Sequence, residues 1–142
     1  MHPTLSQPYK QRFPFRLSVP SFVYPADYAT NVQLLGPFVD EIELLLLESR
    51  AESLPSEGEI DRLAALSIDL QLTYNVHLPL DLDLGSTDPD ARRYAVERLT
   101  AAIERVRPLS PTTHTLHLTY GDKDRSPSSV QDWRARTHGS LT

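Results

Sequence analysis

Short apolar runs alternate with amphipathic stretches along most of this chain. The runs at 15–22, 39–47, 73–78 and 113–120 are bounded by proline, glycine or polar residues, which predicts four strands. The stretches between them carry apolar residues three or four positions apart, which predicts helices. A last helix is expected after Ser126 and Pro127. The predicted order is therefore β-α-β-α-β-α-β, followed by a fourth helix.

The predicted helices have recognisable starts and stops. Asp27 after Pro25 suits the start of the first helix, and Gly36 with Pro37 suits its end. In the second helix, Ser56 followed three residues later by Glu59 is a capping-box pattern, and in the third Asp88 precedes Pro89. Pro108 ends the third helix. The expected apolar faces are Ile60, Leu63, Leu66 and Leu70 in the second helix, and Tyr94, Val96, Leu99, Ile103 and Val106 in the third.

Strands that alternate with helices of this length predict a parallel sheet with right-handed crossovers. Two architectures fit: a small doubly wound open sheet, or part of a (β/α)₈ barrel. A barrel uses about 31 residues for each β/α unit. At that rate the 142 residues hold about four units, which is half of a barrel.

Composition narrows the class of protein. The chain is 39% hydrophobic and 23% charged, which suits one globular domain with a core. Its net charge is −5 and it has no basic run, so neither nucleic acid nor a membrane surface is expected as a partner. It has no cysteine, which excludes disulfides and thiolate ligands. We expect a soluble, cytoplasmic protein.

Two histidines stand at the ends of predicted strands. In "TYNVHL", Asn75 and His77 share the more polar face, and in "THTLHLTY" His117 lies on the corresponding face, opposite His114. Adjacent strands lie about 4.8 Å apart, so the two imidazoles could bind one metal. A lone strand-end histidine is more often a hydrogen-bonded structural residue. Two at matching positions make a metal site and a structural role about equally well supported.

Carboxylates from the second strand extend this candidate site. Glu41 and Glu43 share a face, and Glu43 lies nearer the strand end. A carboxylate beside two imidazoles suits zinc, manganese or iron. Both glutamates also fit a solvated rim, and Asp81 and Asp83 also fit a turn. We predict His77 and His117 as metal ligands, Glu43 as the catalytic residue, and Asn75 and Asp81 as substrate contacts.

Four segments carry a resemblance to a known family. "VPSFVYPADYATNV", "VDEIELLLLESR", "NVHLPLDLDLG" and "THTLHLTYGDKDRSP" together resemble the cobamide-remodelling phosphodiesterases, over about residues 13–138. That family belongs to the xylose-isomerase-like barrel superfamily, which includes the type 2 AP endonucleases. The resemblance implies a (β/α)₈ barrel, of which residues 15–142 would form the N-terminal half after an irregular leader at 1–14.

The resemblance also implies an activity: metal-dependent hydrolysis of the phosphoester in the nucleotide loop of a cobamide, a corrinoid of the vitamin B12 type. Full members continue through four more strands with further ligands, so we expect this length of chain to be inactive by itself. Its open sheet edges predict self-association. Two alternatives stay open: a sugar-phosphate isomerase or epimerase of the same superfamily, and a non-catalytic α/β binding module.

Overall fold

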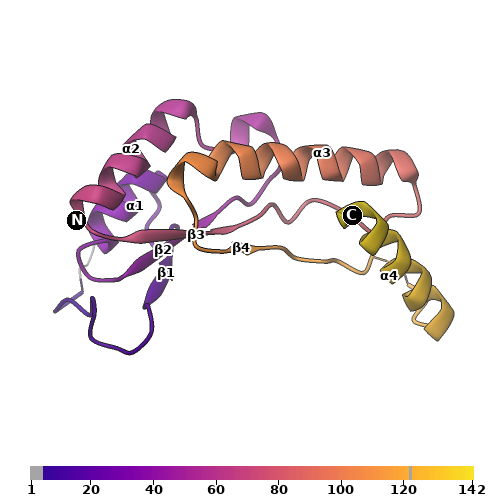
Figure 1. Cartoon of the computed structure of the whole chain (residues 1–142), viewed down its shortest axis with the longest axis horizontal. Coiled ribbons are helices and arrows are strands. Elements are labelled where there is room, and N and C mark those ends of the chain that lie inside the picture. Colours follow the sequence, from indigo (N-terminus) through magenta and orange to yellow (C-terminus); the bar gives the residue numbers. More distant parts are fainter. Residues whose placement is uncertain (1–4, 122) are drawn as a thin grey trace.

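The computed structural model describes residues 5–121 and 123–142. At its centre lies a four-stranded parallel sheet in the order β1-β2-β3-β4, so strands adjacent in the sequence are adjacent in the sheet (Figure 1). This order confirms the architecture that the alternating pattern predicts. The strands are β1 (Ser18–Pro20), β2 (Glu41–Leu45), β3 (Thr73–His77) and β4 (His114–Thr115).

The helices decide between the two predicted architectures. Figure 1 shows α1, α2 and α3 on the same side of the sheet. A doubly wound sheet has helices on both faces, whereas a barrel keeps them all outside. The arrangement is therefore that of a barrel segment. The α-helices are α1 (Tyr28–Leu35), α2 (Glu57–Asp69), α3 (Pro89–Val106) and α4 (Pro127–Leu141), and the short 3₁₀ helices are η1 (Ala51–Ser53) and η2 (Arg107–Leu109).

The helices begin where the sequence predicts. The Asp27 side chain accepts a hydrogen bond of 2.7 Å from a backbone N–H in the first turn of α1. Ser56 and Glu59 form the complete capping box of α2. Asp88 and Ser126 cap α3 and α4 with a proline directly after each cap. These caps satisfy backbone donors that have no partner inside the helix.

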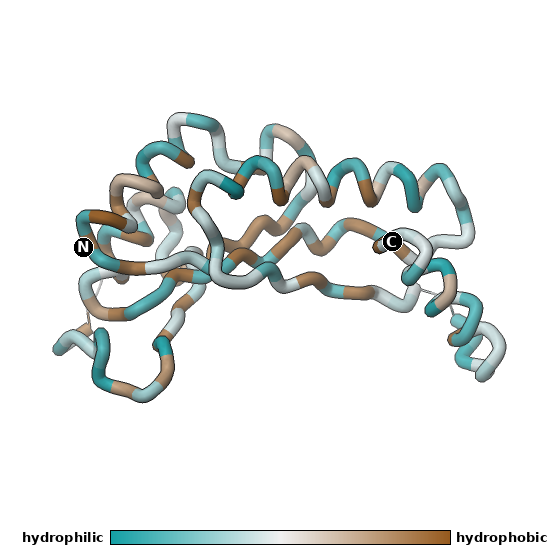
Figure 2. Tube along the Cα trace, in the orientation of Figure 1, coloured by the Kyte–Doolittle hydropathy of each residue, from teal (hydrophilic) through white to brown (hydrophobic). Residues whose placement is uncertain are grey.

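The core lies between the helices and one face of the sheet. Ile42 and Leu44 in β2, and Tyr74 and Val76 in β3, are at most 1% exposed and point toward the helices. Hydrophobic positions recur along these strands (Figure 2). The Tyr74 hydroxyl donates to Leu63 O at 2.8 Å, and burial raises the pKa of Tyr74. Because side chains alternate, the opposite face of the sheet is left for polar residues.

Three details differ from the expectations. The fourth strand was expected over 113–120, but only His114 and Thr115 are in strand conformation, because they pair with β3 on one side alone. His114 was expected on the helix side, and its side chain is exposed. Tyr94 was expected on the apolar face of α3 but is 55% exposed. The buried stripe of α3 consists of Ala95, Leu99, Ala102 and Val106.

The described part of the leader, residues 5–14, has no helix or strand, in line with the prediction, and residues 1–4 lie outside the described residues. Tertiary hydrogen bonds hold this segment. Gln11 N and Leu17 N donate to the Asp40 carboxylate at 2.7 and 2.9 Å, and Lys10 Nζ donates to the carbonyl oxygens of Gly36 and Leu70. Within the described residues, no helix is both long and apolar enough to cross a membrane.

Candidate functional site

The face of the sheet away from the helices carries the polar side chains that the sequence singles out. Glu43 of β2 is in register with Asn75 of β3, and His77 is in register with Thr115 of β4. Side chains in register on parallel strands project to the same face. The carboxyl ends of β2, β3 and β4 therefore bring Glu43, Asn75 and His77 to one region, as the alternation predicts.

The two strand-end histidines lie in direct contact. The ring centroids of His77 and His117 are 4.6 Å apart, and the ring planes meet at 62°. His77 is 9% exposed, and its Nδ1 lies 3.0 Å from Leu78 O. A proton on Nδ1 lets His77 donate to that carbonyl, which leaves the lone pair of Nε2 for a ligand. The structure thus brings together the two imidazoles that the sequence pairs.

The ring contact by itself does not define a metal site. A centroid separation of 4.6 Å with ring planes at 62° is the ordinary geometry of an edge-to-face ring pair. In the part of the chain that is described, no three His, Asp or Glu side chains are grouped to hold a metal ion. Metal binding by His77 and His117 therefore stays a prediction that needs further ligands.

Glu43 is half-buried on the same face. Its backbone oxygen accepts from Ser21 N at 2.9 Å, which ties β2 to the end of β1. None of the described residues donates a hydrogen bond to its carboxylate. A partly buried carboxylate without a structural partner is available for proton transfer, so this position suits the predicted catalytic role.

A second carboxylate, Glu41, is the centre of a network that sequence reasoning missed. Its oxygens accept from Thr112 Oγ1 at 2.7 Å, Asn75 Nδ2 at 2.8 Å and Thr73 Oγ1 at 2.9 Å. Burial acts to raise the pKa of Glu41, but these hydrogen bonds and the Arg16 guanidinium, 3.8 Å away, outweigh burial and lower it. Alternation along β2 places Glu41 on the same face as Glu43. This pattern was the sequence signal that could have identified Glu41.

Both predicted substrate contacts also have structural partners. Asn75 Nδ2 donates to Ser18 Oγ at 3.1 Å as well as to Glu41. The Asp81 carboxylate accepts from Ser49 N at 2.9 Å and from Ser49 Oγ at 3.0 Å. Ser49 O in turn accepts from Arg98 Nε at 2.8 Å. Asp81 thus joins the segments that follow β2 and β3, and substrate contact by Asn75 or Asp81 stays a prediction.

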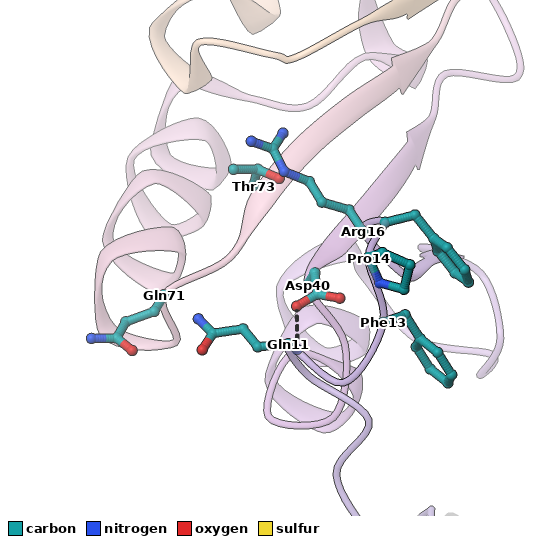
Figure 3. Close-up of a pocket in the computed structure, with 8 residues that line it drawn as sticks. Gln11, Phe13, Pro14, Arg16, Asp40, Gln71 and Thr73 are labelled. Carbon is teal, nitrogen blue, oxygen red and sulfur yellow. Dashed lines mark hydrogen bonds between the residues drawn. The ribbon is translucent and has the colours of Figure 1, made fainter.

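A separate hollow lies at the other end of the strands, near their amino ends. It has a volume of about 440 Å³ and is lined in part by Phe13 and Phe15, whose stacked rings have centroids 5.1 Å apart. Figure 3 shows Asp40 and Arg16 beside it. Asp40 directly precedes β2, so this hollow belongs to the amino edge of the strands. It is therefore not part of the histidine site at the carboxyl edge.

The fold is that of about half of a xylose-isomerase-like (β/α)₈ barrel. The chain is similar to the solved structures of a D-tagatose 3-epimerase-like protein (TM-score 0.72, 20% identity) and of an L-ribulose 3-epimerase (TM-score 0.66, 26% identity). It is also similar to D-psicose 3-epimerase with D-tagatose from Clostridium cellulolyticum H10 (TM-score 0.60, 18% identity). In each case 89% of this chain is covered.

The chain spans about half the length of these structures, covering 46%, 43% and 50% of them. No protein-family model and no curated protein matches the chain. The xylose-isomerase-like superfamily expected from the sequence is thus supported at the level of the fold. The named activities of the three structures fit the expected sugar isomerase or epimerase better than the cobamide phosphodiesterase, and they test neither reaction directly.

Proposed function

We propose that this chain supplies the strand-end metal site of an enzyme with a xylose-isomerase-like barrel. The observation that carries the proposal is the contact between the rings of His77 and His117 at the carboxyl edge of the sheet. This edge is where barrel enzymes place their active sites. The proposed cofactor is a divalent metal, zinc, manganese or iron, and its remaining ligands would come from strands outside this sheet.

The reaction favoured by the comparisons is isomerisation or epimerisation of a sugar. Two sugar 3-epimerases and a D-tagatose 3-epimerase-like protein share this fold. Glu43 lies on the same face as His77, and its carboxylate accepts no hydrogen bond from the described residues. Such a reaction needs a base that removes a proton from carbon and returns it. Glu43 would be that base, and Asn75 and Asp81 would contact the sugar hydroxyls.

The second candidate is hydrolysis of a cobamide phosphoester, which rests on the resemblance of four segments to the phosphodiesterases. Three of these segments are joined in the folded chain: the Tyr28 hydroxyl donates to Leu45 O at 2.6 Å, and Ser49 donates to Asp81. A metal at this site would supply charge neutralisation at the phosphoryl oxygens and a lower pKa for the attacking water.

A metal-binding titration tests the shared part of the proposal. We expect zinc to bind the purified chain in isothermal titration calorimetry, and we expect His77→Ala and His117→Ala each to weaken binding at least tenfold. His114→Ala is the matched control, because His114 is exposed in β4 and lies outside the His77–His117 contact. If no metal binds, or if all three variants bind alike, His77 and His117 do not form a metal site in this chain and the proposal fails.

Ligand binding separates the two reactions. Corrinoid binding that is lost in His77→Ala would support the phosphodiesterase, and a component of D-tagatose binding that is lost in His77→Ala would support the epimerase. The same pair of measurements on Glu43→Gln should leave affinity almost unchanged, because Glu43 is proposed to act in proton transfer and not in holding the substrate. A large loss of affinity in Glu43→Gln would contradict that role.

A further inference from the structure

A cavity of about 310 Å³ lies between the chain segment after β3 and helix α4. Asp83, Gly85, Ser86 and Thr87 form one wall, and Trp133 and Arg136 of α4 form the other. The first wall belongs to the segment that begins at His77 and ends at the start of α3. In α/β folds, such segments at the carboxyl ends of strands build ligand sites.

The two walls are firmly joined. Arg136 Nε donates to Gly85 O at 2.8 Å, and Ser140 Oγ donates to Leu84 O at 2.8 Å. A Cβ atom at position 85 would lie only 2.1 Å from Trp133 Nε1, so glycine is required for this close approach. The cavity is therefore formed before any ligand arrives, which lowers the entropic cost of binding.

Polar groups around this junction lack partners. Trp133 Nε1 and Thr137 Oγ1 are buried and have no hydrogen-bond partner among the described residues, and Thr137 is 5% exposed. A buried polar group without a partner costs about 1–3 kcal/mol. Both atoms lie against Gly85, where a Cβ atom would not fit, so they belong to the tight junction of the two walls and do not contact a ligand in the cavity.

The side chains that line the cavity also have hydrogen-bonding capacity to spare. One Asp83 oxygen accepts from Gly85 N, which leaves the other free to accept. Ser86 Oγ accepts from Asp88 N at 3.2 Å and keeps its own proton to donate. The terminal nitrogens of Arg136 can still donate, since within the described residues no carboxylate forms an ion pair with it.

The balance of charge indicates the ligand. One carboxylate and one guanidinium line the cavity. A phosphate dianion would therefore be attracted by Arg136 and repelled by Asp83. Hydroxyl groups can both donate and accept, and they match Asp83, Arg136, Ser86 and Thr87 together. We infer that this cavity binds a neutral polyhydroxylated molecule, such as a sugar, beside the ring of Trp133. This inference goes beyond the proposed function, because it requires neither a metal nor the histidine pair.

Trp133 is the only tryptophan of the chain and lines this cavity, so its fluorescence can report ligand binding there. It also lines a second hollow, which is bordered by Leu118, Arg134 and Leu141, so variants must assign the signal to one of the two. We expect D-tagatose to change the emission in a saturable way and sodium phosphate to leave it unchanged. Thr87→Ala should weaken D-tagatose binding severalfold, and Arg136→Met at least tenfold. The Thr87 side chain is exposed and forms no hydrogen bond with the described residues, and its backbone oxygen, which accepts from Arg92, is kept in alanine, so this variant separates lost binding from lost structure.

Arg134→Met is the matched control, because Arg134 lies on the same helix and does not line the cavity. Its affinity for D-tagatose should equal that of the parent chain. A response that never saturates, or one that Thr87→Ala leaves intact, would overturn the inference, and saturable binding of phosphate alone would do the same. His77→Ala should bind D-tagatose in this cavity as the parent does, so failure of the metal site and failure of this cavity are distinguishable.

Discussion

Replacing Glu41 by glutamine tests whether its carboxylate holds the polar face of the sheet together. The carboxylate accepts three hydrogen bonds of 2.7–2.9 Å, from two threonine hydroxyls and from the Asn75 amide. Glutamine keeps one accepting oxygen, which Asn75 requires because its Nδ2 can only donate. The hydroxyls of Thr73 and Thr112 can rotate to accept from the new amide. The change thus weakens charged hydrogen bonds without removing them, and we expect a loss of about 1–3 kcal/mol of unfolding free energy at pH 7.

The lowered pKa of Glu41 determines how the stability difference between Glu41→Gln and the parent should change with pH. The pKa of Glu41 is lowered in the folded protein from its ordinary value of 4.5. The unfolded chain therefore binds the proton more tightly, and the stabilisation is present above 4.5 and lost as the pH falls through the folded pKa. Urea unfolding of Glu41→Gln and the parent should thus give free energies that differ most at pH 7 and converge in acid.

Glu43→Gln is the control for this experiment. Glu43 lies on the same strand and face, but its carboxylate accepts no hydrogen bond from the described residues, so we expect its unfolding free energy to change by less than about 0.5 kcal/mol. Equal stability of Glu41→Gln and the parent at pH 7 would refute the reasoning. So would a difference that grows as the pH falls.

Three further predictions concern other parts of the chain. Asn31→Asp should cost about 3 kcal/mol in urea unfolding, because Asn31 is buried and its Nδ2 donates to three carbonyl oxygens that a carboxylate would repel; stability equal to Asn31→Ala would contradict this. Gly85→Ala should lower the melting temperature and shift Trp133 emission, whereas Gly58→Ala in α2, with open space around it, should not shift the emission. Light scattering should give about twice the chain mass of 16.0 kDa if the open sheet edges associate, and a monomer at micromolar concentration would exclude that association.

Local chemistry explains which parts of the fold the sequence could predict. The starts of α2 and α3 depend on residues two or three positions apart, such as Ser56 with Glu59 and Asp88 with Asp90, so the sequence displays them directly. The extent of β4 depends instead on how many partners it has. The apolar pattern predicted a strand over 113–120, but pairing with β3 alone supports two residues.

The same distinction between nearby residues and distant partners explains which parts of the candidate site could be predicted from the sequence. The contact between His77 and His117 was expected from alternation and from the adjacency of β3 and β4, although His117 lies two residues beyond the end of β4. The role of Glu41 did not, because its partner Thr112 is 71 positions away and meets it only through the register of three strands. Asp81 is similar: it was predicted as a substrate contact from its place after β3, and its bond to Ser49 spans 32 positions. Strand ends can thus be predicted to hold polar side chains, whereas the choice between a structural and a chemical role depends on neighbours that only the folded chain supplies. Among the described residues, Glu43 and the histidine pair have few hydrogen-bond partners, and this is the physical reason that we propose the chemistry for them.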